Sequence, residues 1–266
     1  MTDVAEARFH VTSWGSQADP GRRPAVLIHG AQTWGTAPPP YGFTTRRPLA
    51  THRRLLVVDR RGHGASGDAP GDFSSDFEVD AEDVLALLEE VGGAHLVGHS
   101  YGGVVALLAA GRRPDLVASL VVIEHGGLKV AEDEPLVAEA LQRNREGMSK
   151  LPTDLDPEVY LRATASALRE RSCWTADIPL SPLAAAAWPK LVISGTWEGV
   201  HELYRTYAGE PLMLVNRITA DRMGADHLRL RATDHYPHGQ RPDVVNAVLT
   251  AVWEDGDTRA AGQRAG

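Results

Sequence analysis

Cysteine and long apolar segments are what the sequence most clearly lacks. Cys173 is the single cysteine among 266 residues, which excludes an intramolecular disulfide and a zinc site built from several cysteines. No apolar run reaches the length of a membrane span. The opening segment "MTDVAEARFH" has no basic stretch followed by an apolar core, as a secretory signal would have. We therefore expect a cytoplasmic protein with no membrane segment.

The sequence also lacks the clustered basic charge of a nucleic-acid-binding protein. It has 27 lysines and arginines against 35 aspartates and glutamates, for a formal net charge of −8. Nucleic-acid binding needs a basic patch that neutralises phosphates, so we expect no nucleic-acid partner. The hydrophobic content of 43% is ordinary for a globular protein and permits a large buried core.

What the sequence does contain is an alternation of short apolar runs and longer helical patterns. Apolar runs bounded by turn residues predict strands, for example in "PAVLIHG" and "RRLLVVDRRG". Apolar positions at helical spacing predict a helix in "EVDAEDVLALLEEVG". Such alternation is typical of a parallel sheet covered by helices. We predict an α/β fold with a mostly parallel central sheet flanked by helices.

One interruption of this alternation predicts an insertion. Helical patterns follow one another between residues 127 and 187 with no strand pattern among them. We predict that residues 127–187 form a small helical lid on a core made of residues 1–126 and 188–254. The closing segment "DGDTRAAGQRAG" is small and polar, and we expect residues 255–266 to be a disordered tail.

The segment "LVGHSYGGVV", from Leu96 to Val105, places Ser100 between two glycines where a predicted strand turns into a predicted helix. Gly-x-Ser-x-Gly alone is weak evidence, because short glycine and serine patterns recur by chance. The strand before it and the helix after it are the context that a nucleophile elbow requires. The sequence therefore predicts that Ser100 is a nucleophile.

Four segments together resemble the α/β-hydrolase superfamily. In chain order they are "LIHGAQ", "DRRGHGAS", "GHSYGG" and "ATDHYPH". The resemblance covers nearly all of the chain and implies an α/β-hydrolase fold with a catalytic serine, acid and histidine in that order. It implies His235 as the general base, with His238 as a second candidate in the same segment. His99 is expected to point away from the serine.

The acid has two candidates at the catalytic edge of the sheet. The usual position in the superfamily, three residues after the glycine that ends the penultimate strand, is occupied by Glu198. Some relatives instead carry the acid directly after the strand that follows the elbow helix, where Glu124 stands. A glutamate that closes an apolar strand needs a partner to offset its burial. We favour Glu124 and keep Glu198 as the alternative.

Backbone donors for a developing oxyanion are also implied by the resemblance. They are the N–H groups of Tyr101, the residue after the nucleophile, and Ala31, the residue after "HG". The glycines of "DRRGHGAS" are expected to permit a turn, and Asp59 and Arg60 to satisfy local charge.

These assignments predict a serine hydrolase that acts through an acyl-enzyme. We expect a small, apolar or aromatic ester, lactone, thioester or C–C ketone substrate, with Trp34 and Trp197 as substrate contacts. Trp174 and Trp188 are further aromatic candidates. No cofactor or metal is implied, since "GHGASG" lacks the lysine of a phosphate-binding loop.

Two alternatives stay open at this point. One is a non-hydrolytic enzyme of the same superfamily, namely a lyase, an acyltransferase or a cyclase. The other is a non-catalytic protein that binds a small molecule on this scaffold. The sequence predicts no oligomeric state.

Overall fold

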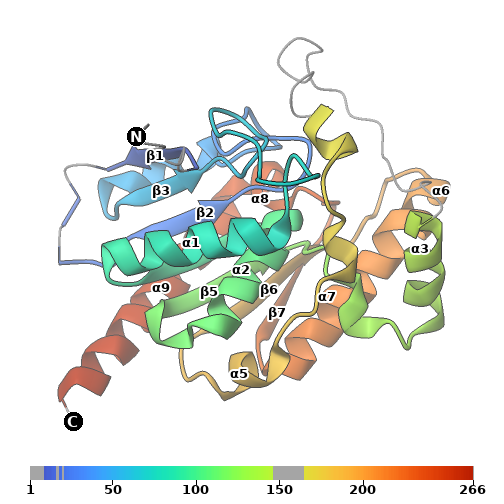
Figure 1. Cartoon of the computed structure of the whole chain (residues 1–266). Coiled ribbons are helices and arrows are strands. Elements are labelled where there is room, and N and C mark those ends of the chain that lie inside the picture. The colour runs from blue at the N-terminus through green and yellow to red at the C-terminus, as the bar shows by residue number, and fades with distance from the viewer. Residues whose placement is uncertain (1–8, 16–17, 20, 146–164, 266) are drawn as a thin grey trace, which may run out of the picture.

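The computed structural model describes residues 9–15, 18–19, 21–145 and 165–265, which form a seven-stranded sheet flanked by helices (Figure 1). The strand order is β1-β3-β2-β4-β5-β6-β7. Strand β1 pairs antiparallel with β3, and the other neighbours pair in parallel. The strands are β1 (Val11–Trp14), β2 (Ala25–Ile28), β3 (Leu55–Val58), β4 (Ala94–His99), β5 (Val117–Ile123), β6 (Lys190–Gly195) and β7 (Asp226–Leu230). The predicted mostly parallel sheet is confirmed.

Helices cover both faces of this sheet. Helices α1 (Phe77–Val91) and α2 (Tyr101–Arg112) pack on one face, while the 3₁₀ helix η1 (Thr44–Thr51) and helix α9 (Pro242–Ala265) pack on the other. Because successive side chains of a strand point to opposite faces, Val26 packs with α2 whereas Leu27 packs with α9. Both layers exclude water from the strands, which explains the continuous apolar runs in the sequence.

The remaining elements lie mainly between β5 and the end of the chain. The α-helices are α3 (Pro135–Arg145), α5 (Leu180–Ala185), α6 (Glu202–Tyr204), α7 (Glu210–Met223) and α8 (Pro237–Gln240). The 3₁₀ helices are η2 (Pro114–Leu116), η3 (Leu128–Ala131) and η4 (Cys173–Thr175), and η5 (Arg205–Gly209) is a π-helical turn.

The predicted insertion at 127–187 contains no strand in the part that the structure describes. Its helix α3 packs against α7 and η3. Its last part differs from the prediction, since Cys173 and Leu183 belong to the same buried cluster as α2, and α5 packs against α2 and α7. The core therefore resumes before residue 188. Much of the second helix expected in the insertion lies outside the described residues.

The expectation of a disordered tail at 255–266 is wrong for the described residues, because α9 continues to Ala265. Asp257 anchors this extension through an ion pair with Arg53 at 2.7 Å and a contact with His95 at 3.1 Å. Asp255 and Arg259 form an i,i+4 pair, which supports an exposed helix. Composition does not reveal these partners, because Arg53 and His95 lie far from Asp257 in the chain.

Candidate active site

Ser100 occupies the sharp turn between β4 and α2. Its backbone has φ 54° and ψ −117°, and its N–H donates to the Ile123 carbonyl of β5 at 2.9 Å. A non-glycine residue in this conformation is strained and persists only when its surroundings hold it. A side chain at Gly98 would clash with the Gly102 carbonyl, and one at Gly102 with the Ile28 carbonyl. The two glycines therefore allow the close approach that presents Ser100.

His235 lies beside Ser100 although 135 residues separate them in the chain. It sits in the loop between β7 and α8, and its Nε2 is 2.9 Å from the Ser100 hydroxyl. The side chain is 15% exposed, so the ring is mostly shielded from water. A hydroxyl within hydrogen-bond distance of an imidazole is the geometry required for proton transfer between them.

His99 contacts the backbone of His235, and the sequence alone does not predict this contact. Its Nε2 lies 2.7 Å from the His235 carbonyl oxygen. Because a carbonyl only accepts, Nε2 of His99 must carry the proton. Burial lowers the pKa of His99 well below its usual value, and the nearby rings of His238 and His235 lower it further. His99 is therefore a neutral donor that holds the backbone of His235.

Glu124 lies on the other side of His235. Its Oε2 is 3.6 Å from Nδ1 of His235, and its side chain is 0% exposed. Its Oε1 accepts from the Gly195 N–H at 2.6 Å and from the indole N–H of Trp197 at 3.3 Å. Its backbone has φ 47°, a left-handed conformation that is uncommon for a residue other than glycine. These donors stabilise a buried carboxylate directed at the imidazole.

Glu198 occupies a different environment. Its side chain is 47% exposed, and its Oε2 lies 3.8 Å from Nε of Arg231. Among the ion pairs of the described residues, none joins Glu198 to His235. The structure thus brings Glu124, rather than Glu198, together with Ser100 and His235.

The two predicted oxyanion donors border the same serine. Tyr101 begins α2, so its N–H lies in the first turn, where helical N–H groups lack an intrahelical partner. Ala31 follows Gly30, and a Cβ on Gly30 would lie 3.0 Å from Cβ of Ser100. The backbone of both candidates therefore lies next to the predicted nucleophile.

The tryptophans predicted to contact substrate differ in their burial. Trp34 is half-buried. Trp197, by contrast, is 0% exposed and packs against Ala208 and Leu212. Its indole N–H donates to Glu124, so the structure gives this predicted substrate contact a different partner. Trp188 donates to the Pro114 carbonyl at 3.0 Å and precedes the amino end of β6, the sheet edge opposite Ser100.

Three further features of the described residues concern metal binding, membrane crossing and thiol chemistry. No group of three or more His, Cys, Asp or Glu side chains among them could hold a metal ion. No described helix is long and apolar enough to cross a membrane. Cys173 is buried, and burial raises the pKa of its thiol, which opposes formation of a nucleophilic thiolate.

Residues 25–248 match the family model described as "Alpha/beta hydrolase family". The match spans most of the chain and includes the elbow, Glu124 and His235. The chain therefore belongs to the alpha/beta hydrolase family.

Curated relatives differ in the activities their names give. A "2-(acetamidomethylene)succinate hydrolase" of Mesorhizobium japonicum is 30% identical over 228 residues, which are 76% of this chain and 79% of that protein. A "Dihydrolipoyllysine-residue acetyltransferase component of acetoin cleaving system" of Pseudomonas putida is 37% identical over 130 residues, 47% of this chain. This match covers 32% of the length of that component. The match to a mouse "sn-1-specific diacylglycerol lipase ABHD11" covers 24% of the lipase, so the chain spans about a third or less of these two relatives.

Solved structures share the fold. One described as "Est816 as an N-Acyl homoserine lactone degrading enzyme" aligns with a TM-score of 0.62 at 20% identity, covering 91% of this chain and 96% of that one. At this identity the similarity shows the fold alone.

Proposed function

We propose that the protein is a serine hydrolase in which Ser100 is the nucleophile, His235 the general base and Glu124 the acid. The observation that carries the proposal is the continuous row of contacts at one sheet edge: 2.9 Å from Ser100 to His235 and 3.6 Å from His235 to Glu124. Each residue follows a different strand, so the row is assembled by the fold rather than by sequence proximity. Membership of a family with hydrolase relatives supports the same conclusion.

The proposed reaction follows from this row. Nε2 of His235 takes the proton of Ser100 as its oxygen attacks the carbonyl carbon, and the N–H groups of Ala31 and Tyr101 stabilise the resulting oxyanion. The leaving group receives that proton when the carbonyl re-forms, which leaves an acyl group on Ser100. Water, deprotonated by His235, then releases the acid and restores the serine. Glu124 stabilises the imidazolium in both steps.

We keep the substrate as a small ester, lactone, thioester or C–C ketone with apolar or aromatic character. Trp34 remains the proposed aromatic contact, since it is half-buried at the loop that carries Ala31. The described part of residues 127–187 contributes α3 and η3 at the side of α7, in keeping with a helical lid. A cytoplasmic location is also part of the proposal.

Acyl transfer to an acceptor other than water is a second candidate, favoured by the relative named as an acetyltransferase component. The two outcomes share the acyl-enzyme and differ only in what attacks it. Product analysis with an added alcohol or thiol separates them: hydrolysis gives free acid alone, whereas transfer gives a new ester or thioester.

The test of the proposed function is turnover of p-nitrophenyl esters of increasing chain length, together with a lactone and a thioester. We expect saturable hydrolysis of at least one substrate and loss of that activity in Ser100→Ala. Activity retained by Ser100→Ala, or no turnover across the panel, contradicts the proposal and favours the alternative of a binding protein.

A further inference from the structure

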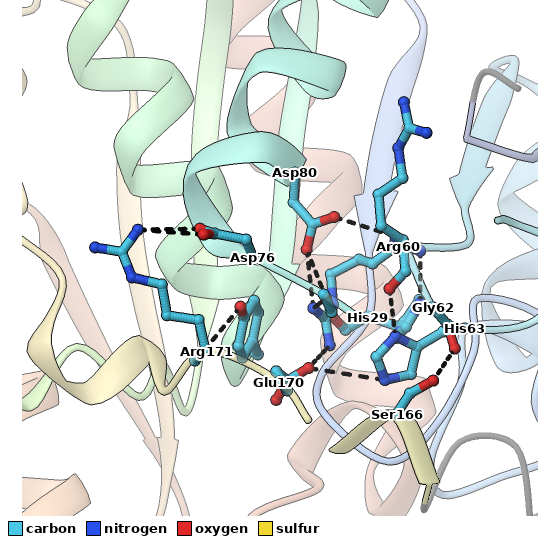
Figure 2. A network of polar contacts seen from close by, with 12 residues as sticks. His29, Arg60, Gly62, His63, Asp76, Asp80, Ser166, Glu170 and Arg171 are labelled. Carbon is cyan, nitrogen blue, oxygen red and sulfur yellow. Dashed lines mark hydrogen bonds and ion pairs between the residues drawn. The ribbon is translucent and has the colours of Figure 1, made fainter. Parts of the chain in front are cut away.

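The guanidinium of Arg60 lies within a buried network of polar contacts, which Figure 2 shows with Asp80 and Glu170. Arg60 follows β3 and its side chain is 0% exposed. Its nitrogens donate to the carbonyls of His29 (3.1 Å) and Gly30 (3.0 Å), to Ser75 Oγ (2.8 Å), and to the carboxylates of Asp80 (2.9 Å) and Glu170 (2.8 Å). A buried guanidinium is tolerated when its donors are satisfied in this way.

The contact with Gly30 holds the Gly30–Ala31 peptide group, whose N–H is a proposed oxyanion donor. The Gly30 carbonyl and the Ala31 N–H belong to the same peptide bond, which is planar and trans, so the two groups point in opposite directions. Arg60 Nη2 at 3.0 Å and His29 Nδ1 at 2.7 Å both donate to this carbonyl. Holding the carbonyl from one side directs the N–H to the other and polarises it as a donor.

His29 is suited to this task by its own partners. Its Nε2 lies 2.9 Å from the backbone N–H of Arg60 and therefore accepts. The proton of the neutral ring must then be on Nδ1, which donates to the Gly30 carbonyl. Burial lowers the pKa of His29 well below its usual value, with the charge of Arg60 acting in the same direction. The ring is thus kept in the one neutral tautomer that serves the peptide.

The same guanidinium also contacts the residue that carries the second donor. Cζ of Arg60 lies 3.8 Å from the centre of the Tyr101 ring, a cation–π distance. The Tyr101 hydroxyl donates to the Arg171 carbonyl at 3.0 Å. One cation therefore touches both chain segments whose N–H groups we assign to the oxyanion.

The network also includes residues that follow the predicted lid helices in the chain. Glu170 and Arg171 lie in the region 127–187, and Glu170 binds Arg60 while the N–H of Arg171 donates to the Ser75 carbonyl at 3.0 Å. Ser166 donates to the Gly62 carbonyl in the same loop as Arg60. The returning segment is thereby fastened to the loop that holds the Gly30–Ala31 peptide.

We propose that Arg60 is a positioning residue for the oxyanion site: it orients the Gly30–Ala31 peptide and the ring of Tyr101, with Glu170 linking this hold to the segment that returns from the lid. The proposal rests on the proposed function. A merely structural arginine would affect stability alone, whereas a positioning residue also changes the affinity for a transition-state mimic.

The test compares Arg60→Lys with Arg61→Lys. Lysine keeps the charge but loses the planar fork that reaches two carbonyls and two carboxylates at once. Arg61 is adjacent in the chain, and its guanidinium pairs with Asp83 at 2.6 Å, so it serves as the matched control. Each variant is assayed for ester kcat and KM and for inhibition by an alkyl trifluoromethyl ketone, whose adduct with the serine carries an oxyanion.

For Arg60→Lys we expect kcat to fall about 10- to 100-fold with KM within about threefold, and the inhibition constant of the ketone to rise by a similar factor. Arg61→Lys should leave both within about twofold. If Arg60→Lys does not fold, Glu170→Gln takes its place, with an expected change of about 3- to 10-fold in both quantities.

A folded variant with unchanged kcat and unchanged ketone affinity overturns the proposal, as does a change confined to KM. Failure of the proposed function is distinguishable, because the wild-type protein would then neither turn over esters nor bind the ketone.

Discussion

Oε2 of Glu124 and Nδ1 of His235 lie 3.6 Å apart, and neither atom has a hydrogen-bond partner among the described residues. A buried polar atom without a hydrogen-bond partner destabilises the folded protein. A shorter contact between these two atoms would therefore be more stable. Catalytic hydrogen bonds are often long in the free enzyme and tighten when substrate binds. In the proposed reaction, we therefore expect this distance to shorten when His235 becomes cationic.

The two acid candidates are separated by paired substitutions. We expect Glu124→Gln to lower kcat by about 10²–10⁴-fold, because an amide neither stabilises the imidazolium nor fixes its tautomer. Glu198→Gln, at the exposed site beside Arg231, should change kcat by less than about threefold. Steady-state kinetics on one ester decides between them, and the reverse ranking would make Glu198 the acid.

Trp197 and Trp34 should affect different kinetic constants. Trp197→Phe removes the indole donor to Glu124 and is expected to lower kcat about 3- to 10-fold with KM unchanged. Trp34→Phe should raise KM for an aromatic ester with little change in kcat, as expected for a residue that contributes to substrate binding. A rise in KM for Trp197→Phe would contradict its placement behind the acid.

The elbow glycine Gly102 should tolerate no side chain. Gly102→Ala places a methyl group against the carbonyls of Ile28 and His29, and we expect a loss of about 2–4 kcal/mol in the free energy of unfolding. Gly262→Ala is the control, because nothing lies within 4 Å of a Cβ there and alanine favours a helix by up to about 1 kcal/mol. Urea denaturation measures both; equal effects would show that the elbow is not tightly packed.

Buried histidines should make the fold sensitive to acid. Burial lowers the pKa of His125 and of His238 to about 3, and that of His29 and His99 well below the usual value. The unfolded chain therefore binds more protons than the folded chain below about pH 6.5, so stability falls as the pH falls. His125 and His238 each contribute a loss of about 2 kcal/mol between pH 7.5 and pH 5.

This dependence is measured by urea unfolding from pH 7.5 to pH 5. The slope of the unfolding free energy against pH gives the number of protons taken up on unfolding. His125→Asn should lower that number by about one. A flat profile in the wild-type protein would mean that these histidines take up protons as readily in the folded chain as in the unfolded chain.

The sequence was informative where a motif and its neighbouring elements agree. Ser100 is flanked by a strand, a helix and two glycines, and His235 follows the last strand, so both positions follow from local pattern and chain order. The acid is different. Glu124 and Glu198 both follow strands at the same edge, and which one faces His235 depends on the backbone conformation at Glu124 and on the donors from Gly195 and Trp197.

The contacts of Arg60 are even harder to predict from the sequence. Its local segment suggested a turn with satisfied charges, whereas its partners Asp80 and Glu170 stand 20 and 110 residues away in the chain. Long-range contacts of this kind leave no periodic signal in one sequence. The extension of α9 beyond residue 254 likewise depends on long-range contacts, since Asp257 pairs with Arg53 and His95.

The most direct test of the account is the mass of the protein and of its Ser100 peptide after reaction with a fluorophosphonate. The account predicts a single adduct on Ser100 in the wild-type protein, no adduct in Ser100→Ala, and much slower labelling in Glu124→Gln. No adduct in the wild-type protein, or an adduct that persists in Ser100→Ala, would contradict the assignment of Ser100 as a nucleophile activated by His235 and Glu124.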